Sequence, residues 1–388
     1  MRVVLDATAI PPDLGGVGRY VAELAPALVS AGVELAVVCQ VRDADLFAAR
    51  VAGAEIVPAP ERAAGRGARL VWEQVGLPRV VRALRGDVLH SPHYTMPLRV
   101  RAAQVVTLHD ATFFTAPEVH SAGKRRFFRA ATRLAVSRAD ALVVPSIATR
   151  TEVLRCAGGR AERFHVAYHG VDRTVFHPVD AAGRARVAAS LGLGDQPYVA
   201  FLGTLEPRKN VPALVRAWVR AVAGTTAPPA LVLAGGPGWD RAVGPAVDAV
   251  PTDLQVLRPG YLPFADLPGF LAGAQVVAYP SLGEGFGLPV LEAMACGAAV
   301  LTSRELSLPE VGGDAVAYCG TGEEDIAAAL GALLADPGRR DELAARALDR
   351  AAGFTWQASA EAHVVAFEAA LRRSAGAQSR SDSSRPSR

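Results

Sequence analysis

The chain has 388 residues, of which 51% are hydrophobic and 20% charged, and its formal net charge is +3. This length exceeds what one hydrophobic core normally organises, so we expect two or three domains. No apolar run approaches the roughly 18 residues that span a bilayer, and the small net charge disfavours a dedicated nucleic-acid-binding protein.

The first residues, "MRVVLDATAIPPD", predict a strand rather than a signal peptide, because the apolar run is short and contains Asp6. The four cysteines, Cys39, Cys156, Cys296 and Cys319, are scattered without a Cys-x-x-Cys pair. They predict neither a disulfide framework nor a zinc site. We therefore expect a cytoplasmic protein with reduced thiols and no metal or cofactor of its own.

Short β-rich apolar runs alternate with amphipathic stretches along most of the chain. In the first half we expect strands within 2–7, 33–39, 54–58, 87–90, 103–110, 140–146 and 163–170. After "VDRTVFHPVDAAGRA" (171–185) the alternation restarts, with strands expected within 197–204, 230–236, 253–261, 274–281, 298–303 and 314–320. Such alternation predicts βα units and parallel sheets.

This pattern predicts an α/β protein with two doubly wound, Rossmann-like domains, residues 1–177 and 178–353, facing a central cleft. Residues 354–373 have apolar residues at helical spacing and predict a closing helix that crosses back to the N-terminal domain. The Ser- and Arg-rich residues 374–388 are expected to be disordered.

A glycine-rich loop follows the first strand, with Gly15, Gly16 and Gly18 in "GGVGRY". Glycines there let backbone N–H groups approach a phosphate at a helix N-terminus. The spacing is not Gly-x-Gly-x-x-Gly, which disfavours a nicotinamide cofactor. A turn without any ligand is an equally open interpretation.

Two cations, Arg208 and Lys209, follow the strand that ends at Gly203 in "FLGTLEPRKN". They stand just before a helix expected to begin near Asn210. Cations at the carboxyl end of a strand and beside a helix N-terminus suit an anion such as a diphosphate. The alternative is a solvated pair without a ligand.

Two acids, Glu284 and Glu292, flank a Gly-Phe-Gly-Leu-Pro turn in "YPSLGEGFGLPVLEAMACGAAVLTS". Pro289 suits the first turn of a helix that begins near Gly287 or Leu288. Glu284 then lies in the loop and Glu292 in the second helical turn, where both carboxylates can accept hydrogen bonds from vicinal hydroxyls. A cleft with acids for hydroxyls and cations for a diphosphate predicts a ligand that has hydroxyls at both ends and a diphosphate between them. A nucleotide sugar fits this description.

These motifs together resemble the retaining family 4 glycosyltransferases, which have the GT-B fold. Glu284 and Glu292 match the E-x7-E signature of that family, and "GGVGRY", "VAYHGVD", "FLGTLEPRKN", "LVLAGG" and "FTW" occur in its order over residues 2–372. "WEQVGLP", "DVLHSPHYTMP" and "VVTLHDATFF" are similar to the bacterial mannosyltransferases of O-antigen and related polysaccharide assembly.

The resemblance implies roles for individual residues. Glu284 would bind hydroxyls of the donor sugar and Glu292 the ribose, while Arg208 and Lys209 would neutralise the diphosphate. His109 matches the family histidine near the anomeric carbon, and a histidine bonded to Asp110 or to a carbonyl is the alternative. The remaining expected donor contacts are Gly16, Gly203, Gly285, Phe286, Gly287 and Leu288. Thr204 stands where many relatives have an arginine, which leaves one phosphate contact in doubt.

We therefore expect metal-independent transfer of a hexose, with retention of configuration, from a nucleoside diphosphate sugar to a glycan or lipid-linked acceptor on the N-terminal domain. GDP-mannose is the preferred donor, with UDP- and dTDP-sugars open. A nucleotide-sugar epimerase or a non-catalytic nucleotide-sugar-binding protein is the alternative. The E-x7-E pair and the Arg-Lys pair favour transfer.

The segment "KRRFFRAATRLAVSR" (124–138) predicts an amphipathic helix with Arg125, Arg126, Arg129 and Arg133 on one face. Such a face could contact an anionic membrane, such as the inner face of the plasma membrane, or the phosphate of an acceptor. Packing of the apolar face on the first sheet with the arginines in water is the alternative.

Overall fold

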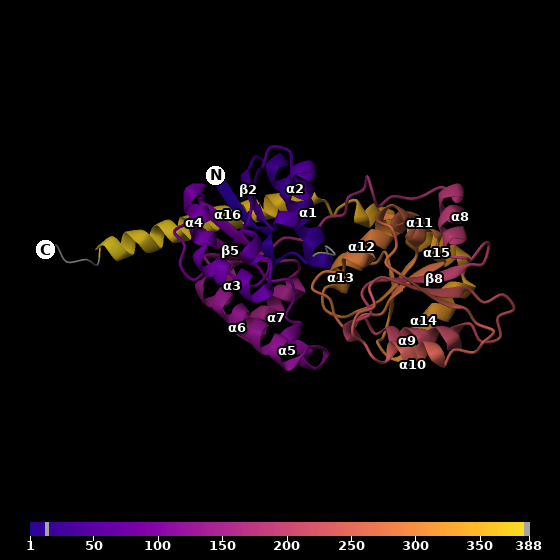
Figure 1. Ribbon diagram of the computed structural model, residues 1–388. Coiled ribbons are helices and arrows are strands. Elements are labelled where there is room, and N and C mark those ends of the chain that lie inside the picture. Colours follow the sequence, from indigo (N-terminus) through magenta and orange to yellow (C-terminus); the bar gives the residue numbers. More distant parts are fainter. Residues whose placement is uncertain (12–14, 384–388) are drawn as a thin grey trace. The chain divides into compact units, whose positions relative to one another are not determined.

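The computed structural model describes residues 1–11 and 15–383, and side chains as far as residue 376 (Figure 1). The chain forms two compact units. The first contains Met1–Gly170 together with the chain from Thr355 onward, and the second is Val171–Phe354. Each is built on a parallel sheet with helices on both faces, so the predicted fold class is confirmed.

The sheet of the first unit has seven strands in the order β3-β2-β1-β4-β5-β6-β7, all parallel. Because β1 lies between β2 and β4, the strand order reverses direction at the β1–β4 pair. The strands are β1 (Arg2–Asp6), β2 (Glu34–Cys39), β3 (Glu55–Pro58), β4 (Val88–Ser91), β5 (Ala103–Thr107), β6 (Ala141–Val144) and β7 (Phe164–Val166).

Helices cover both faces of this sheet because successive strand residues point to opposite sides. Val3 and Leu5 pack in one cluster with residues of three helices, α1 (Gly15–Ser30), α2 (Ala44–Arg50) and α16 (Trp356–Ser383). Val4 packs in another cluster, with α3 (Arg66–Val75) and α4 (Leu77–Ala83). Further along the same sheet, α6 (Ala122–Arg138) and α7 (Ile147–Ala157) cover β5 and β6, and the short α5 (Thr112–Thr115) precedes α6.

The sheet of the second unit has six parallel strands in the order β10-β9-β8-β11-β12-β13. Its strand order reverses at the β8–β11 pair. The strands are β8 (Tyr198–Leu202), β9 (Ala230–Ala234), β10 (Val256–Gly260), β11 (Val276–Tyr279), β12 (Val300–Ser303) and β13 (Ala317–Cys319). The described strands of both sheets coincide closely with the segments expected from the sequence.

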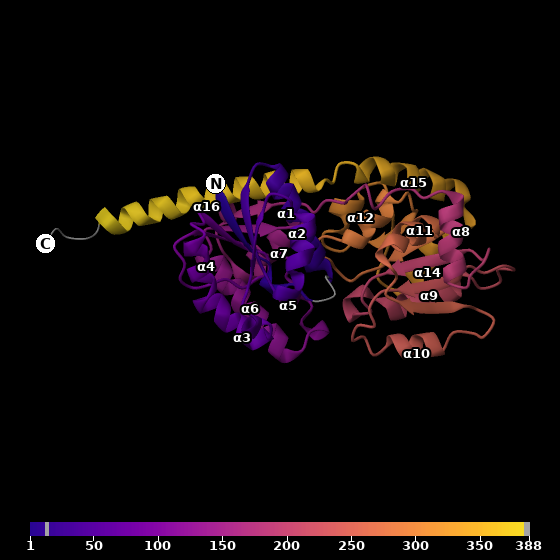
Figure 2. The ribbon, with the colours of Figure 1, turned by 45° about the horizontal axis from the view of Figure 1, so that its top comes forward.

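Helices also cover the second sheet (Figure 2). α9 (Val211–Ala221) packs on α14 (Glu323–Ala335) and on α10 (Val243–Asp248). α11 (Leu267–Gly273) packs on α8 (Ala181–Ser190) and α12 (Leu288–Ala295), and α12 contacts α13 (Leu308–Gly312) and α15 (Pro337–Ala351). Among the helices of the described residues, none is both long enough and apolar enough to cross a membrane.

The boundary between the two units lies at Gly170/Val171, seven residues before the predicted boundary at 177/178. Val171 N–H donates to the Phe354 carbonyl at 3.1 Å. The Phe176 ring contacts Phe264 with centroids 5.8 Å apart. These contacts fix the segment after Gly170 to the second unit, although the alternation of strands and helices resumes only later.

The closing helix α16 belongs to the first unit, as expected, but it extends to Ser383. The prediction of a disordered tail from residue 374 was therefore wrong for 374–383, and 384–388 lie outside the described residues. Packing of Phe367 and Ala370 against the sheet orders the helix upstream. Beyond that point the sequence is rich in Ser and Arg, but it has no proline before Pro386, so a helix nucleated upstream can propagate.

A buried network of side chains ties α16 to the first sheet. The Tyr20 hydroxyl lies 2.7 Å from His363 Nε2 and 3.1 Å from Thr107 Oγ1, and His90 Nε2 lies 2.8 Å from the same threonine oxygen. His363 Nδ1 lies 2.6 Å from the Ser359 carbonyl, which can only accept. The proton is therefore assigned to Nδ1, and Tyr20 donates to Nε2.

Replacing Tyr20 by phenylalanine should lower the melting temperature by roughly 3–8 °C, because the substitution leaves buried His363 Nε2 without its donor. Tyr318→Phe is the matched control, since it removes one hydrogen bond to the Gly313 carbonyl from a half-buried position. Calorimetry of both variants tests the network. A loss for Tyr20→Phe no larger than for Tyr318→Phe would contradict it.

Candidate functional site

The carboxyl ends of β8 and β11 bring distant parts of the chain together. β8 pairs with β11 in parallel, with Val199 opposite Val276. Ligands of doubly wound sheets bind outside the carboxyl ends of strands at the point where the strand order reverses. Gly203, Arg208 and Lys209 follow β8, and Glu284 follows β11, so the predicted residues of this unit gather at that position.

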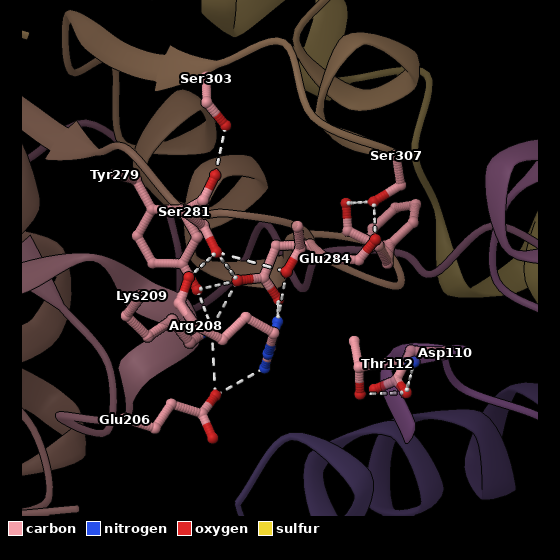
Figure 3. A network of polar contacts seen from close by, with 12 residues as sticks. Asp110, Thr112, Glu206, Arg208, Lys209, Tyr279, Ser281, Glu284, Ser303 and Ser307 are labelled. Atoms are coloured by element: carbon pink, nitrogen blue, oxygen red, sulfur yellow. Dashed lines mark hydrogen bonds and ion pairs between the residues drawn. The ribbon is translucent and has the colours of Figure 1, made fainter. Parts of the chain in front are cut away.

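Glu284 is the centre of a buried polar cluster (Figure 3). Its Oε1 accepts hydrogen bonds from Lys209 Nζ at 2.7 Å, Ser281 Oγ at 2.7 Å and the Tyr279 hydroxyl at 3.1 Å. Its Oε2 pairs with Arg208 Nη1. The same Arg208 nitrogen donates to the Gly283 carbonyl at 2.8 Å. One carboxylate therefore positions both cations.

Arg208 reaches a second acid, Glu206, whose Oε1 lies 2.6 Å from Arg208 Nη2. The same oxygen is 4.0 Å from Lys209 Nζ. The Arg208 side chain is 16% exposed and that of Lys209 is 9% exposed. The two cations are thus held in place by two acids, and the interpretation as a solvated pair is wrong.

Electrostatics keep the Glu284 carboxylate charged. Burial opposes ionisation, but Arg208 and Lys209 outweigh this effect and lower the pKa of Glu284 to about 2. Burial and the neighbouring Arg208 lower the pKa of Lys209, while Glu284 and Glu206 oppose that shift. At neutral pH Glu284 can accept hydrogen bonds but cannot serve as a proton donor.

Serine side chains fix the loop that carries Glu284. Ser281 Oγ lies 2.9 Å from the Arg208 carbonyl, which joins the loops after β8 and β11. Ser307 Oγ lies 2.8 Å from the Glu284 carbonyl and 2.9 Å from the Phe286 carbonyl. These bonds hold the backbone from Gly285 onward as it enters α12.

α12 begins at Leu288 and places Glu292 in its second turn, as expected from Pro289. Gly287 precedes the helix with φ of 106°, and a Cβ there would lie 3.0 Å from Leu308 Cδ2. This position requires glycine. Glu292 is buried, and its expected contact with a ribose stays a prediction.

In the first unit, Gly16 lies in the first turn of α1, and a Cβ added to it would meet no atom of the described residues within 4 Å. Packing against the described part of this unit therefore does not require the glycine. Its expected approach to a phosphate stays a prediction, and Gly16→Ala separates that role from a structural one.

His109 follows β5 and is bonded to a carbonyl rather than to Asp110. Its Nε2 lies 2.6 Å from the Pro92 oxygen, so Nε2 carries the proton and Nδ1 is the acceptor. Burial lowers the pKa of His109, partly offset by this hydrogen bond and by Asp110. The neutral ring can accept a hydrogen bond from a hydroxyl at Nδ1.

Comparison with known proteins identifies the family. Models of Glycosyltransferase Family 4 and of Glycosyl transferases group 1 match residues 14–175 and 184–350. The O-antigen chain mannosyltransferase B of Escherichia coli is 33% identical over 279 residues, which cover 71% of this chain and 73% of that protein. The chain belongs to glycosyltransferase family 4. Its reaction is the transfer of a sugar from a nucleotide sugar.

Two further similarities extend over nearly the whole chain. The glycosyltransferase is 30% identical to the alpha-maltose-1-phosphate synthase of Mycolicibacterium smegmatis, over 93% of this chain and 97% of that protein. Anabaena HepE, solved in complex with UDP and glucose, is 19% identical, with a TM-score of 0.73 over 93% of this chain and 97% of that chain. The structural likeness shows the GT-B fold.

Sequence reasoning missed three residues of the glycosyltransferase's buried cluster. Tyr279 and Ser281 lie at the end of β11 and just after it and contact Glu284, and Glu206 precedes Arg208 by two residues and pairs with it. These residues lie at or shortly after the ends of predicted strands, and that position could have marked them as candidates for the site. Among the described residues, no group of His, Cys, Asp or Glu side chains could hold a metal ion.

Another buried carboxylate, Glu73, lies in the first unit, within "WEQVGLP". Glu73 Oε2 is 2.9 Å from Arg69 Nη1 and 2.6 Å from Thr95 Oγ1. Burial and nearby Asp6 raise the pKa of Glu73, while Arg69 and Thr95 oppose the shift. Helix α3 is thereby joined to the segment that follows β4.

The arginines of α6 are used largely within the unit. Arg129 Nε donates to the Phe113 carbonyl at 2.6 Å, and the guanidinium groups of Arg129 and Arg133 lie over Phe114. Arg125 Nη1 donates to the Pro117 carbonyl at 3.3 Å. Arg126 is exposed. Contact of this helix with a membrane or an acceptor stays a prediction.

Replacing Glu284 by glutamine should lower the melting temperature at pH 7 by roughly 6 °C or more, because two buried cations lose their carboxylate. The folded-state pKa of about 2 lies below the ordinary 4.5. The stabilisation is therefore complete above about pH 4.5 and is lost as the pH falls from there toward 2. Melting curves of both proteins from pH 3 to pH 8 measure it.

Glu342→Gln is the control for this experiment, because Glu342 is 44% exposed and pairs with Arg339 and Arg346 on the surface. This substitution should lower the melting temperature only slightly, because an exposed ion pair contributes little to stability. A difference between wild type and Glu284→Gln that stays constant down to pH 3 would contradict the role assigned to the charged carboxylate.

Proposed function

We propose that the protein transfers a hexose, with mannose as the first choice, from a nucleoside diphosphate sugar to a glycan or lipid-linked acceptor. The configuration at the anomeric carbon is retained and no metal ion is needed. The observation that carries this proposal is the buried cluster in which Glu284 holds Arg208 and Lys209 at the carboxyl ends of β8 and β11.

In this proposal the diphosphate of the donor lies against Arg208 and Lys209. The bond between the anomeric carbon and the phosphate oxygen breaks, and its electron pair stays on the leaving diphosphate. Fixed cations stabilise the charge that develops there, and such electrostatic stabilisation usually contributes most to the rate of a reaction of this kind. They supply the charge that a divalent ion would otherwise bring.

The acceptor's hydroxyl oxygen forms the new bond to the anomeric carbon from the face that the phosphate leaves. Its proton passes to the departing phosphate, so no side chain has to serve as the base. Ionised Glu284 accepts a hydrogen bond from a sugar hydroxyl, and neutral His109 accepts one at Nδ1. Both roles agree with the direction of the pKa shifts at these residues.

The choice of mannose rests on the Escherichia coli relative, which is named an O-antigen chain mannosyltransferase, and the choice of GDP rests on the sequence resemblance to bacterial mannosyltransferases. The Mycolicibacterium smegmatis relative is named for a maltose phosphate product, and Anabaena HepE was solved with UDP. UDP- and dTDP-linked sugars are therefore tested beside GDP-mannose. We expect the acceptor to be selected by α3 and the segment after β4, which the hydrogen bond between Thr95 and Glu73 joins.

The first experiment is thermal stabilisation by GDP, UDP, dTDP and their sugars without added metal, since a ligand of the folded state raises the melting temperature. One nucleotide should stabilise selectively. In Arg208→Ala plus Lys209→Ala the stabilisation should vanish, and kcat/KM should fall by roughly a thousandfold. Incubation without an acceptor reports any epimerase activity.

Arg216→Ala plus Arg220→Ala is the matched control, because it removes two exposed cations from α9 in the same unit. This control variant should show the same rise in melting temperature with the nucleotide as the wild type. If the double alanine variant does not fold, Arg208→Lys takes its place, because it keeps the charge and loses the bidentate geometry. Equal stabilisation of wild type and site variants by every nucleotide would refute the proposed donor site.

Glu206 competes with the diphosphate for Arg208 in this arrangement, because its carboxylate lies 2.6 Å from Arg208 Nη2. Glu206→Gln should therefore tighten binding of the stabilising nucleoside diphosphate about three- to tenfold. Titration calorimetry measures the dissociation constant, with the exposed Glu324→Gln as control. Weaker binding would instead mean that Glu206 positions Arg208 for the ligand.

A further inference from the structure

A hollow of about 770 Å³ lies at the amino-terminal edge of the sheet in the first unit, where the strands begin. It is bounded by the end of α4, the segment that leads into β5, and the later part of α16. Val88 and Ala103, where β4 and β5 begin, mark this edge. None of the residues expected to contact the donor lines this hollow.

The lining of the hollow is strongly basic. Four arginines, Arg82, Arg85, Arg99 and Arg101, contribute four positive charges, and Asp87 contributes one negative charge. The formal charge of the lining is thus 4 − 1 = +3, which equals the net charge of the whole 388-residue chain. The hollow is therefore a local concentration of positive charge.

These arginines lack acidic partners among the described side chains. The ion pairs of the described residues use Arg2, Arg69 and Arg208, for example, and none involves the four arginines of the hollow. Asp87 forms no ion pair with them among the described side chains, and its Oδ2 accepts the Arg2 backbone N–H at 2.8 Å. All four arginines are exposed, so their guanidinium groups are accessible to a ligand.

The walls between the arginines are apolar. Val81 and Val100 belong to the hydrophobic cluster on this face of the sheet, and Leu371 comes from α16. Planar guanidinium groups bind phosphate oxygens through paired hydrogen bonds. A concave surface that combines them with aliphatic side chains fits a phosphate ester that also carries an apolar part.

We propose that this hollow binds a phosphate-bearing anion, either the headgroup of an anionic lipid or a soluble phosphate compound. The site is separate from the donor site, which lies at the carboxyl ends of strands in the other unit, and it does not depend on the proposed reaction. α16 supplies one wall, so the closing helix has a binding role beyond covering the sheet.

The test compares two double variants, Arg82→Gln plus Arg99→Gln and Arg85→Gln plus Arg101→Gln, with the full-length wild type. Cosedimentation uses vesicles of phosphatidylglycerol and phosphatidylcholine in equal amounts, and pure phosphatidylcholine as a blank. A second arm titrates inorganic phosphate and octyl phosphate by calorimetry. The control, Arg138→Gln plus Arg173→Gln, removes two exposed arginines outside the hollow.

Each double variant of the hollow should weaken binding by roughly tenfold or more, and the control by less than about threefold. Weaker binding of the double variants to the vesicles identifies a lipid headgroup as the ligand. Weaker binding only to inorganic phosphate or octyl phosphate identifies a soluble compound. If neither arm distinguishes the variants from the control, the proposal is wrong. Unchanged melting temperatures and an unchanged donor-nucleotide response show that the variants remain folded.

Discussion

The pairing of one buried carboxylate with two cations is the interaction on which the second unit's site depends. Arg208 and Lys209 arrive from β8 and Glu284 from β11, so the loops after these strands are joined by charge as well as by the sheet. Buried cations without Glu284 would be costly. The acid that we propose as a contact of the sugar is thus also the residue that keeps the two cations in place.

Much of this arrangement could be predicted from the sequence because parallel sheets place the ends of their strands at one edge. Arg208, Lys209 and Glu284 were each recognisable as polar residues after apolar runs, and Pro289 marked the start of α12. Tyr279 and Glu206 were missed because a tyrosine in an apolar run and an acid beside an arginine have ordinary explanations. Pairwise contacts decide their roles, and spacing alone does not reveal contacts.

The errors at the ends of elements have a common physical cause. The helix α16 continues past residue 373 because its packed first half removes the cost of nucleation, although the composition of the tail resembles that of disordered segments. The boundary after Gly170 is likewise set by the contacts of Val171 and Phe176, while the repeating strand pattern resumes later. Tertiary packing overrode composition in both places.

The position of α16 also has a consequence for synthesis. The helix packs on β4, β5, β6 and β7, yet it follows the whole second unit in the chain. At about 5–20 residues per second, a ribosome needs roughly 10–40 s to make residues 171–354. During that time α1 and α2 can cover only part of this face, and the part over β4 to β7 that receives Phe367 and Ala370 lacks α16. The second unit can finish folding while the first still waits for its last element.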